Sequence, residues 1–136
     1  MKQTYHGSCH CGAVTFEADL DFAQGTAKCN CTFCWKQRMW KAGASQADFR
    51  LLSGKDALGD YSKSGEWGEG HHRFCKRCGI ATHSHGSIEA MGGDFLSVHV
   101  SALDDLPIDD LVNAPLRYMD GLHDNWREQP AETRHL

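Results

Sequence analysis

The chain has 136 residues, of which 40% are hydrophobic and 24% charged, with a formal net charge of −4. This length is typical of one domain, and the composition is that of a folded globular protein rather than a disordered, collagen-like or membrane chain. A negative net charge gives no general attraction for phosphate backbones or anionic lipids. We therefore expect a single domain over residues 1–136, with neither nucleic acid nor a membrane as partner.

The sequence contains no segment typical of export. Residues 1–7 lack the apolar run of a secretory signal, and no stretch approaches the about 18 apolar residues of a spanning helix, so we expect a cytoplasmic protein. Thiols stay reduced in that compartment, and an odd number of cysteines fits a disulfide framework poorly. The seven cysteines therefore indicate metal binding or thiol chemistry.

The first elements are predicted to form a hairpin. Residues 4–8 suit a short strand, and residues 13–18 suit a second one, because apolar side chains recur there at every second position (Val14, Phe16 and Ala18). The turn between the two strands carries Cys9 and Cys11 at its tip.

A short helix is expected after the second group of cysteines. Residues 25–28 are an extended entry, and Asn30 or Thr32 can cap a helix that continues to about Met39. The cysteines would then lie at the positive end of the helix, which favours a thiolate by about 0.3 to 1 kcal/mol.

The remainder of the chain is predicted to be mostly β. The pattern favours a strand near Trp40, a glycine-rich loop over residues 64–70, a helical turn from near Pro107 and an irregular tail from Pro115. A second hairpin is expected with Cys75 and Cys78 at its tip. Strands are predicted over residues 49–54, 58–62, 71–74, 80–85 and 95–100.

Cys75 and Cys78 have the spacing of a zinc knuckle. Two residues between the cysteines let the chain turn around an ion, and a following glycine can adopt the positive φ that such a turn often requires. Cys9 and Cys11 are the natural other half, because they also lie at a predicted hairpin tip and precede a glycine. These four cysteines would form a closed, structural zinc site.

Cys29, Cys31 and Cys34 are then left as a group of three. Three thiolates leave one position of a tetrahedral zinc ion open for water or a substrate, which is the mark of a catalytic site. A thiol that entered the open position would be deprotonated at neutral pH.

Three other interpretations of this group stay open. A histidine could close the site and make it a second structural one, with His83, His85 and His99 as the candidates. Cys31 and Cys34 could instead be a redox pair, although the strand-rich pattern lacks the alternating helices of thioredoxin-like proteins. The three could also be buried apolar cysteines, against which the intervening Asn30 and Thr32 argue.

The order and spacing of the three cysteine groups resemble one known family. The motifs are Gly7-Ser8-Cys9-His10-Cys11-Gly12-Ala13-Val14-x-Phe16, Cys29-Asn30-Cys31-Thr32-x-Cys34 and Phe74-Cys75-x-x-Cys78-Gly79. They are similar to those of glutathione-dependent formaldehyde-activating enzymes, also called the GFA domain, from Tyr5 to about Val100.

The resemblance implies a mostly-β fold called a β-tent, in which small sheets and one or two short helices surround zinc. It implies two zinc ions per chain, a structural one on Cys9, Cys11, Cys75 and Cys78 and a catalytic one on Cys29, Cys31 and Cys34. The implied activity is that of a carbon–sulfur lyase, which forms or cleaves a thiol–aldehyde adduct such as S-hydroxymethylglutathione through a zinc-bound thiolate. The implied partner is a small thiol such as glutathione, or its aldehyde adduct.

Two different classes of function compete with this one. A zinc-stapled binding module without turnover would have the same cysteines and a closed second site. A nucleic-acid-binding protein would depend on Lys76 and Arg77 alone, and the net charge of −4 speaks against it.

Overall fold

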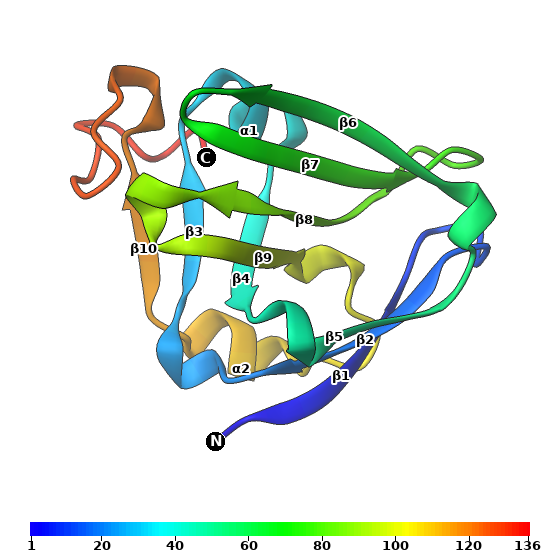
Figure 1. The fold of residues 1–136 in the computed structure, drawn as a ribbon. Coiled ribbons are helices and arrows are strands. Elements are labelled where there is room, and N and C mark those ends of the chain that lie inside the picture. Colours follow the sequence, from blue (N-terminus) through cyan, green and yellow to red (C-terminus); the bar gives the residue numbers. More distant parts are fainter.

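The structure is a computed structural model that describes residues 1–136. It confirms the mostly-β class with two short α-helices (Figure 1). The strands are β1 (Gln3–Ser8), β2 (Thr15–Leu20), β3 (Thr26–Cys29), β4 (Trp40–Ala44), β5 (Phe49–Ser53), β6 (Leu58–Gly65), β7 (Gly68–Cys75), β8 (Ala81–Ile88), β9 (Gly93–His99) and β10 (Leu116–Met119), and the helices are α1 (Thr32–Gln37) and α2 (Ile108–Asn113).

The first sheet has three strands in the order β1-β2-β5, and all its pairs are antiparallel. The predicted hairpin of β1 and β2 is present, with Tyr5 opposite Ala18. Residues of β2 alternate between buried and half-buried, as expected for a strand with one face on the core.

The second sheet has seven strands in the order β10-β3-β4-β9-β8-β7-β6. Only β10 and β3 are parallel; the other neighbours are antiparallel. In Figure 1 strands β3, β4 and β10 run upright while β6 to β9 run across the view, so the sheet twists strongly between β4 and β9. None of the helices is long and apolar enough to cross a bilayer.

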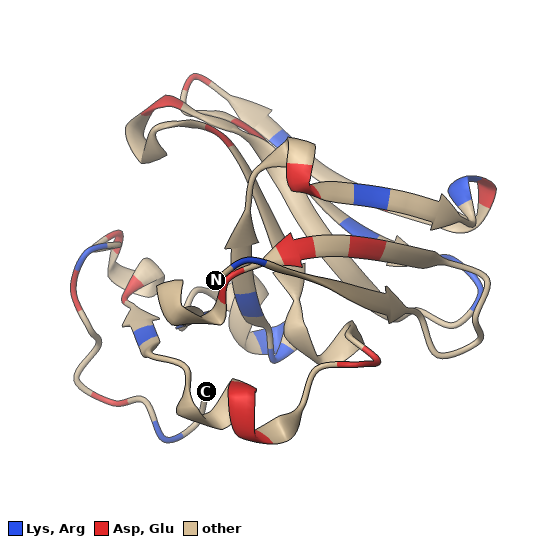
Figure 2. Ribbon diagram, turned by 90° about the horizontal axis from the view of Figure 1, so that it is seen from below, with Lys and Arg blue, Asp and Glu red and all other residues tan.

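The main hydrophobic core lies between the two sheets. It joins β1 and β2 to the faces of β4 and β9 that point toward them, and Phe16 and Val98 are fully buried within it. Two smaller apolar clusters lie apart from this core, and each contains cysteines, Cys29 and Cys34 in one and Cys9 and Cys75 in the other. Acidic and basic residues are interspersed along the ribbon (Figure 2).

Two local predictions were wrong. The glycine-rich segment 64–70 is not a loop, because β6 and β7 continue through it to a tight turn with Gly65 opposite Gly68. The β7 part of this polar segment also pairs with β8, which supplies it with backbone hydrogen-bond partners. The glycine content of the segment does not reveal this pairing. The chain after Pro115 is also not wholly irregular, since β10 adds four residues beside β3.

His83 is a core histidine rather than a ligand. Its ring lies 4.2 Å from that of Phe49 and 6.4 Å from that of Phe16, and His85, two residues along β8, points to the same side. Burial lowers the pKa of His83 to about 3, because a buried imidazolium loses its hydration.

We therefore expect His83 to make the protein sensitive to acid. The unfolded chain binds a proton at this residue below its ordinary pKa of about 6.5 and the folded chain does not, so stability falls as the pH drops from there toward 3. From about pH 7 to about pH 5 this residue should reduce the free energy of unfolding by about 2 kcal/mol. Urea unfolding of His83→Gln at both pH values should show a decrease in the free energy of unfolding that is smaller by that amount than the decrease in the unmodified protein. An equal decrease in the two proteins would contradict the assignment.

Candidate metal centres

Cys9, Cys11, Cys75 and Cys78 lie together, as predicted from the two hairpin tips. Their sulfur atoms all lie within 4.8 Å of one another, and the Cys9–Cys11 and Cys11–Cys75 distances are both 3.7 Å. A tetrahedron of thiolates around zinc, with zinc–sulfur bonds of about 2.3 Å, has sulfur–sulfur edges of about 3.8 Å. The donor set and its spacing therefore fit a four-coordinate zinc ion.

The two turns that present these cysteines have the same backbone design. The amide of Cys9 donates to the Val14 carbonyl across the first turn at 3.0 Å, and that of Cys75 donates to the Ile80 carbonyl across the second at 2.9 Å. The glycine after each pair, Gly12 and Gly79, has a φ of 81°. A side chain would strain the backbone at this angle, which explains why a glycine follows each pair of cysteines.

Backbone amides also point at the sulfur atoms. The Val14 amide lies 3.3 Å from the Cys9 sulfur, and the Arg77 amide lies 3.4 Å from the Cys75 sulfur. Amide donors stabilise negative charge on sulfur. A hydrogen bond from the Cys11 amide is the main reason why the pKa of Cys78 is lowered, to about 6. The cluster joins the β1–β2 turn of one sheet to the β7–β8 turn of the other, so it ties the two sheets together.

Cys29, Cys31 and Cys34 form the second cluster, with their sulfur atoms within 4.8 Å of one another. Cys29 is the last residue of β3, and Cys34 lies in the first turns of α1. The helix cap is Cys31, not Asn30 or Thr32, because the Cys31 sulfur accepts the Cys34 amide at 3.4 Å. The same contact caps the helix and brings two of the thiols together.

The three thiols are electrostatically coupled. Hydrogen bonds with the Cys29 and Cys34 thiols lower the pKa of Cys31 to about 2, and the positive charge of Lys41 lowers it further. The same two neighbouring thiols, Cys29 and Cys31, raise the pKa of Cys34. One thiolate is therefore favoured within the cluster, and its neighbours donate to it.

No histidine nitrogen or carboxylate oxygen joins this group of three. His83 and His85 point to the side of the sheet where Phe16 and Phe49 pack, and the Nδ1 atom of His99 contacts the Ser101 hydroxyl at 2.8 Å. A site closed by one of these histidines is thus not formed. All seven cysteines are free thiols.

Sequence reasoning missed a link between this cluster and the segment after β10. Asn30, which is 5% exposed, donates from Nδ2 to Asp120 at 2.8 Å and accepts the Leu122 amide at 3.0 Å. Asp120 also contacts the His123 ring at 2.9 Å. The sequence does hint at this link, because residues 120–126 are rich in polar and charged side chains, but an ordinary turn accounts for that composition equally well.

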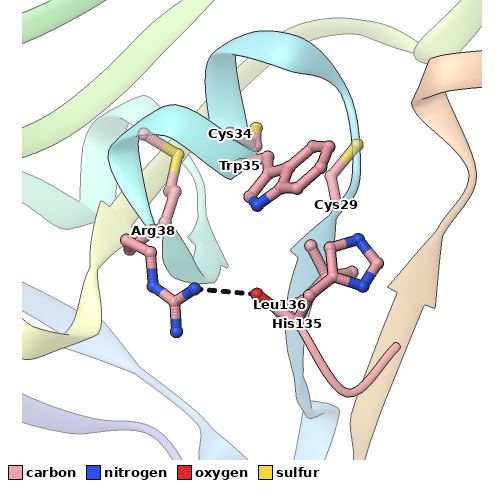
Figure 3. A pocket seen from close by; sticks show the side chains of 7 residues that line it. Cys29, Cys34, Trp35, Arg38, His135 and Leu136 are labelled. Carbon is pink, nitrogen blue, oxygen red and sulfur yellow. Dashed lines mark hydrogen bonds between the residues drawn. The ribbon is translucent and has the colours of Figure 1, made fainter. Parts of the chain in front are cut away.

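The last residues of the chain cover one side of the three-cysteine cluster (Figure 3). The His135 ring lies 4.8 Å from that of Trp35, and Arg38 donates to the His135 carbonyl at 2.7 Å. The cavity that these residues share with Cys29 and Cys34 has a volume of only about 10 Å³, which is space for about one water molecule. A substrate larger than water must reach the cluster from another side.

Gly121 is a further constraint on the cluster. A Cβ atom at this position would lie 2.6 Å from the Cys29 sulfur and 2.5 Å from the Trp126 ring, so Gly121→Ala must displace one of them. We expect this variant to lose metal from the three-cysteine cluster to a chelator at least about tenfold faster, as loss of supporting contacts does at other metal sites. Gly43→Ala is the matched control, because nothing lies within 4 Å of its Cβ position. Equal rates of metal loss would show that the cluster tolerates the displacement.

The fold and these two clusters together define a mostly-β protein with one set of four and one set of three cysteines that can hold metal ions. The sequence matches the family of glutathione-dependent formaldehyde-activating enzymes over residues 4–116, and the chain belongs to that family. Its structure is also similar to the crystal structure of a Rhodobacter sphaeroides protein, with a TM-score of 0.67 and 30% sequence identity. That match covers 82% of this chain and 99% of the other.

Proposed function

We propose that this protein is a zinc-dependent carbon–sulfur lyase that forms or cleaves a thiol–aldehyde adduct such as S-hydroxymethylglutathione. The observation that carries the proposal is the contrast between the two clusters, one with four thiols and one with three and no fourth ligand. Family membership supports it, because the family is named for activating formaldehyde with glutathione.

In this proposal the protein binds two zinc ions. Cys9, Cys11, Cys75 and Cys78 hold a structural ion, and Cys29, Cys31 and Cys34 hold a catalytic one. The catalytic ion would supply Lewis acidity, which keeps a thiol substrate deprotonated at neutral pH. The cytoplasm is the proposed location, because thiols there stay reduced and available to metal ions.

The chemistry requires a nucleophile and a proton. The substrate sulfur attacks the aldehyde carbon, a carbon–sulfur bond forms, and the electron pair of the carbonyl double bond moves to oxygen, which then takes up a proton. Asp120 and His123 form a hydrogen-bonded pair beside the Asn30 side chain and can pass a proton to that oxygen, directly or through water. Cleavage follows the same steps in reverse.

The test is a turnover measurement on the protein with two zinc ions bound. Exchange between free glutathione and S-hydroxymethylglutathione in the presence of formaldehyde can be followed by NMR. The uncatalysed exchange in a protein-free sample gives the baseline rate. We expect the protein to accelerate exchange and to bind glutathione in native mass spectrometry. Binding or exchange no different from a protein-free sample would refute the proposal.

The competing function, a binding module without turnover, is distinguished by the fourth ligand of the second zinc ion. X-ray absorption should show one ligand of this ion replaced by sulfur when a thiol is added, if the site is catalytic. A spectrum that the thiol leaves unchanged would favour a closed, structural site.

A further inference from the structure

A groove of about 420 Å³ lies on the seven-stranded sheet, and strands β3, β4, β9 and β10 contribute to it. Its lining includes two cationic side chains, Lys41 of β4 and Arg117 of β10, and no aspartate or glutamate. The chain as a whole has a net charge of −4. The groove is thus locally cationic on an otherwise acidic protein, and a site of this kind favours an anionic ligand.

Strand register places the two cations in one row. Arg117 pairs with Ala27 on one side, and Lys41 pairs with Ala27 on the other, so both flank the same residue of β3. Strands β10, β3 and β4 lie side by side in the sheet (Figure 1). With neighbouring strands about 4.8 Å apart, the backbones of Lys41 and Arg117 are separated by roughly 10 Å.

The same register connects this row to the three-cysteine cluster. Cys29 follows Ala27 by two residues, so their side chains share one face of β3, about 7 Å apart along the strand. Met119, the partner of Cys29 on β10, packs against it and also lines the groove. The groove therefore reaches Met119, which packs against the three-cysteine cluster, and neither His135 nor Leu136 lines it.

Neither cation is engaged by an acidic group of the protein. Lys41 forms no salt bridge or side-chain hydrogen bond, and the Arg117 guanidinium forms no salt bridge and one side-chain hydrogen bond, to the Met119 sulfur at 3.8 Å. By contrast, Arg50 is held by Glu17 and Asp19 on the other sheet. Lys41 and Arg117 are thus available to an external carboxylate.

A second cavity, of about 300 Å³, matches such a ligand less well. It is bordered by the ring of Phe33, stacked 3.8 Å from His72, and its single cation is Arg73. That guanidinium already donates to the Gly59 carbonyl at 3.0 Å and contacts His85 at 3.3 Å. The groove with Lys41 and Arg117 is therefore the better site for carboxylates.

We propose that Lys41 and Arg117 are specificity-determining residues that bind the carboxylates of an acidic peptide thiol and direct its sulfur toward Cys29, Cys31 and Cys34. An extended tripeptide spans roughly 10 Å, which is about the separation of the backbones that carry the two cations, and glutathione has one carboxylate near each end with the thiol between them. Carboxylates bind lysine and arginine through charge-assisted hydrogen bonds. This inference rests on the proposed function and deepens it, because it selects acidic thiols over neutral ones.

Binding of S-methylglutathione tests the groove separately from the chemistry. This compound keeps both carboxylates and has no free thiol, so its affinity does not depend on turnover. Calorimetry on the zinc-loaded protein should show that esterifying both carboxylates weakens binding at least about tenfold, and that Arg117→Gln and Lys41→Gln each raise the Kd for the acid about tenfold. Arg127→Gln, an exposed arginine outside the groove, is the matched control and should bind like the unmodified protein.

The outcomes separate this inference from the proposed function. Absence of S-methylglutathione binding, or binding that esterification or the two groove variants leave unchanged, overturns the inference even if the protein accelerates exchange with glutathione. Binding that depends on both cations supports it even if no exchange is accelerated, in which case the proposed reaction is what fails.

Discussion

Replacing Cys75 with serine should leave the protein unfolded at room temperature. Cys75 is fully buried beside Cys9, Val14 and Leu58, and its sulfur lies 3.7 Å from that of Cys11. The variant would retain three of four thiol ligands at the site and place a hydroxyl group among apolar side chains. Circular dichroism and the zinc content of the purified variant provide the measurement.

The expected size of this effect follows from two free energies. A structural zinc site can supply about 10 to 16 kcal/mol of binding free energy, whereas a whole domain is stable by only about 5 to 15 kcal/mol. In this fold the cluster ties the β1–β2 turn to the β7–β8 turn and so joins the two sheets. Without the ion, the small apolar cluster around Val14 and Leu58 has little else to hold it.

The matched control is the same substitution in the other cluster, Cys31→Ser. A folded Cys75→Ser protein with an unchanged unfolding midpoint would show that the four-cysteine cluster is not needed for stability. A folded Cys75→Ser protein with one zinc ion fewer and a lower unfolding midpoint would show that the cluster stabilises the fold, but by less than expected here.

The cysteine clusters could be predicted from the sequence because their signals are local. Each pair of the four-cysteine cluster lies in a turn between two strands, and a glycine with a φ of 81° follows each pair. Antiparallel neighbours and turn chemistry are encoded within a few residues. Joining the two turns required only the count of ligands that a closed zinc site needs.

The groove could not be predicted in this way. Arg117 reaches Ala27 through a parallel pairing of strands about ninety residues apart, and β10 is too short to show an alternating pattern. The contact of Asn30 with Asp120 spans the same sequence distance. Both features depend on contacts between segments far apart in the sequence, which no turn or local pattern reveals.

Replacing Cys31 with serine should give a different outcome from Cys75→Ser, namely a folded protein that has lost its activity. Cys31 caps α1 by accepting the Cys34 amide, and serine is among the preferred residues at this position, so the helix keeps its cap. Cys31 is also only half-buried. The unfolding midpoint should therefore change little.

The metal site, in contrast, should fail. Serine leaves Cys29 and Cys34 as the only two thiols of the cluster, and the pKa of Cys34 is raised while that of Cys31 is lowered, so the substitution removes the thiol that ionises most readily. Mutating residues that only support metal ligands typically lowers metal affinity or activity about 10- to 100-fold. Loss of a ligand itself should therefore reduce the exchange rate by at least about 100-fold.

Zinc content, the unfolding midpoint and the exchange rate, measured on one preparation of Cys31→Ser, decide between the functions. One zinc ion per chain, an unchanged midpoint and no acceleration of exchange is the result expected of an open, catalytic site. Unfolding like that of Cys75→Ser would mean that the three-cysteine cluster is structural, which is what a binding module with two closed sites requires. Full activity with the second ion lost would mean that the reaction takes place elsewhere on the protein.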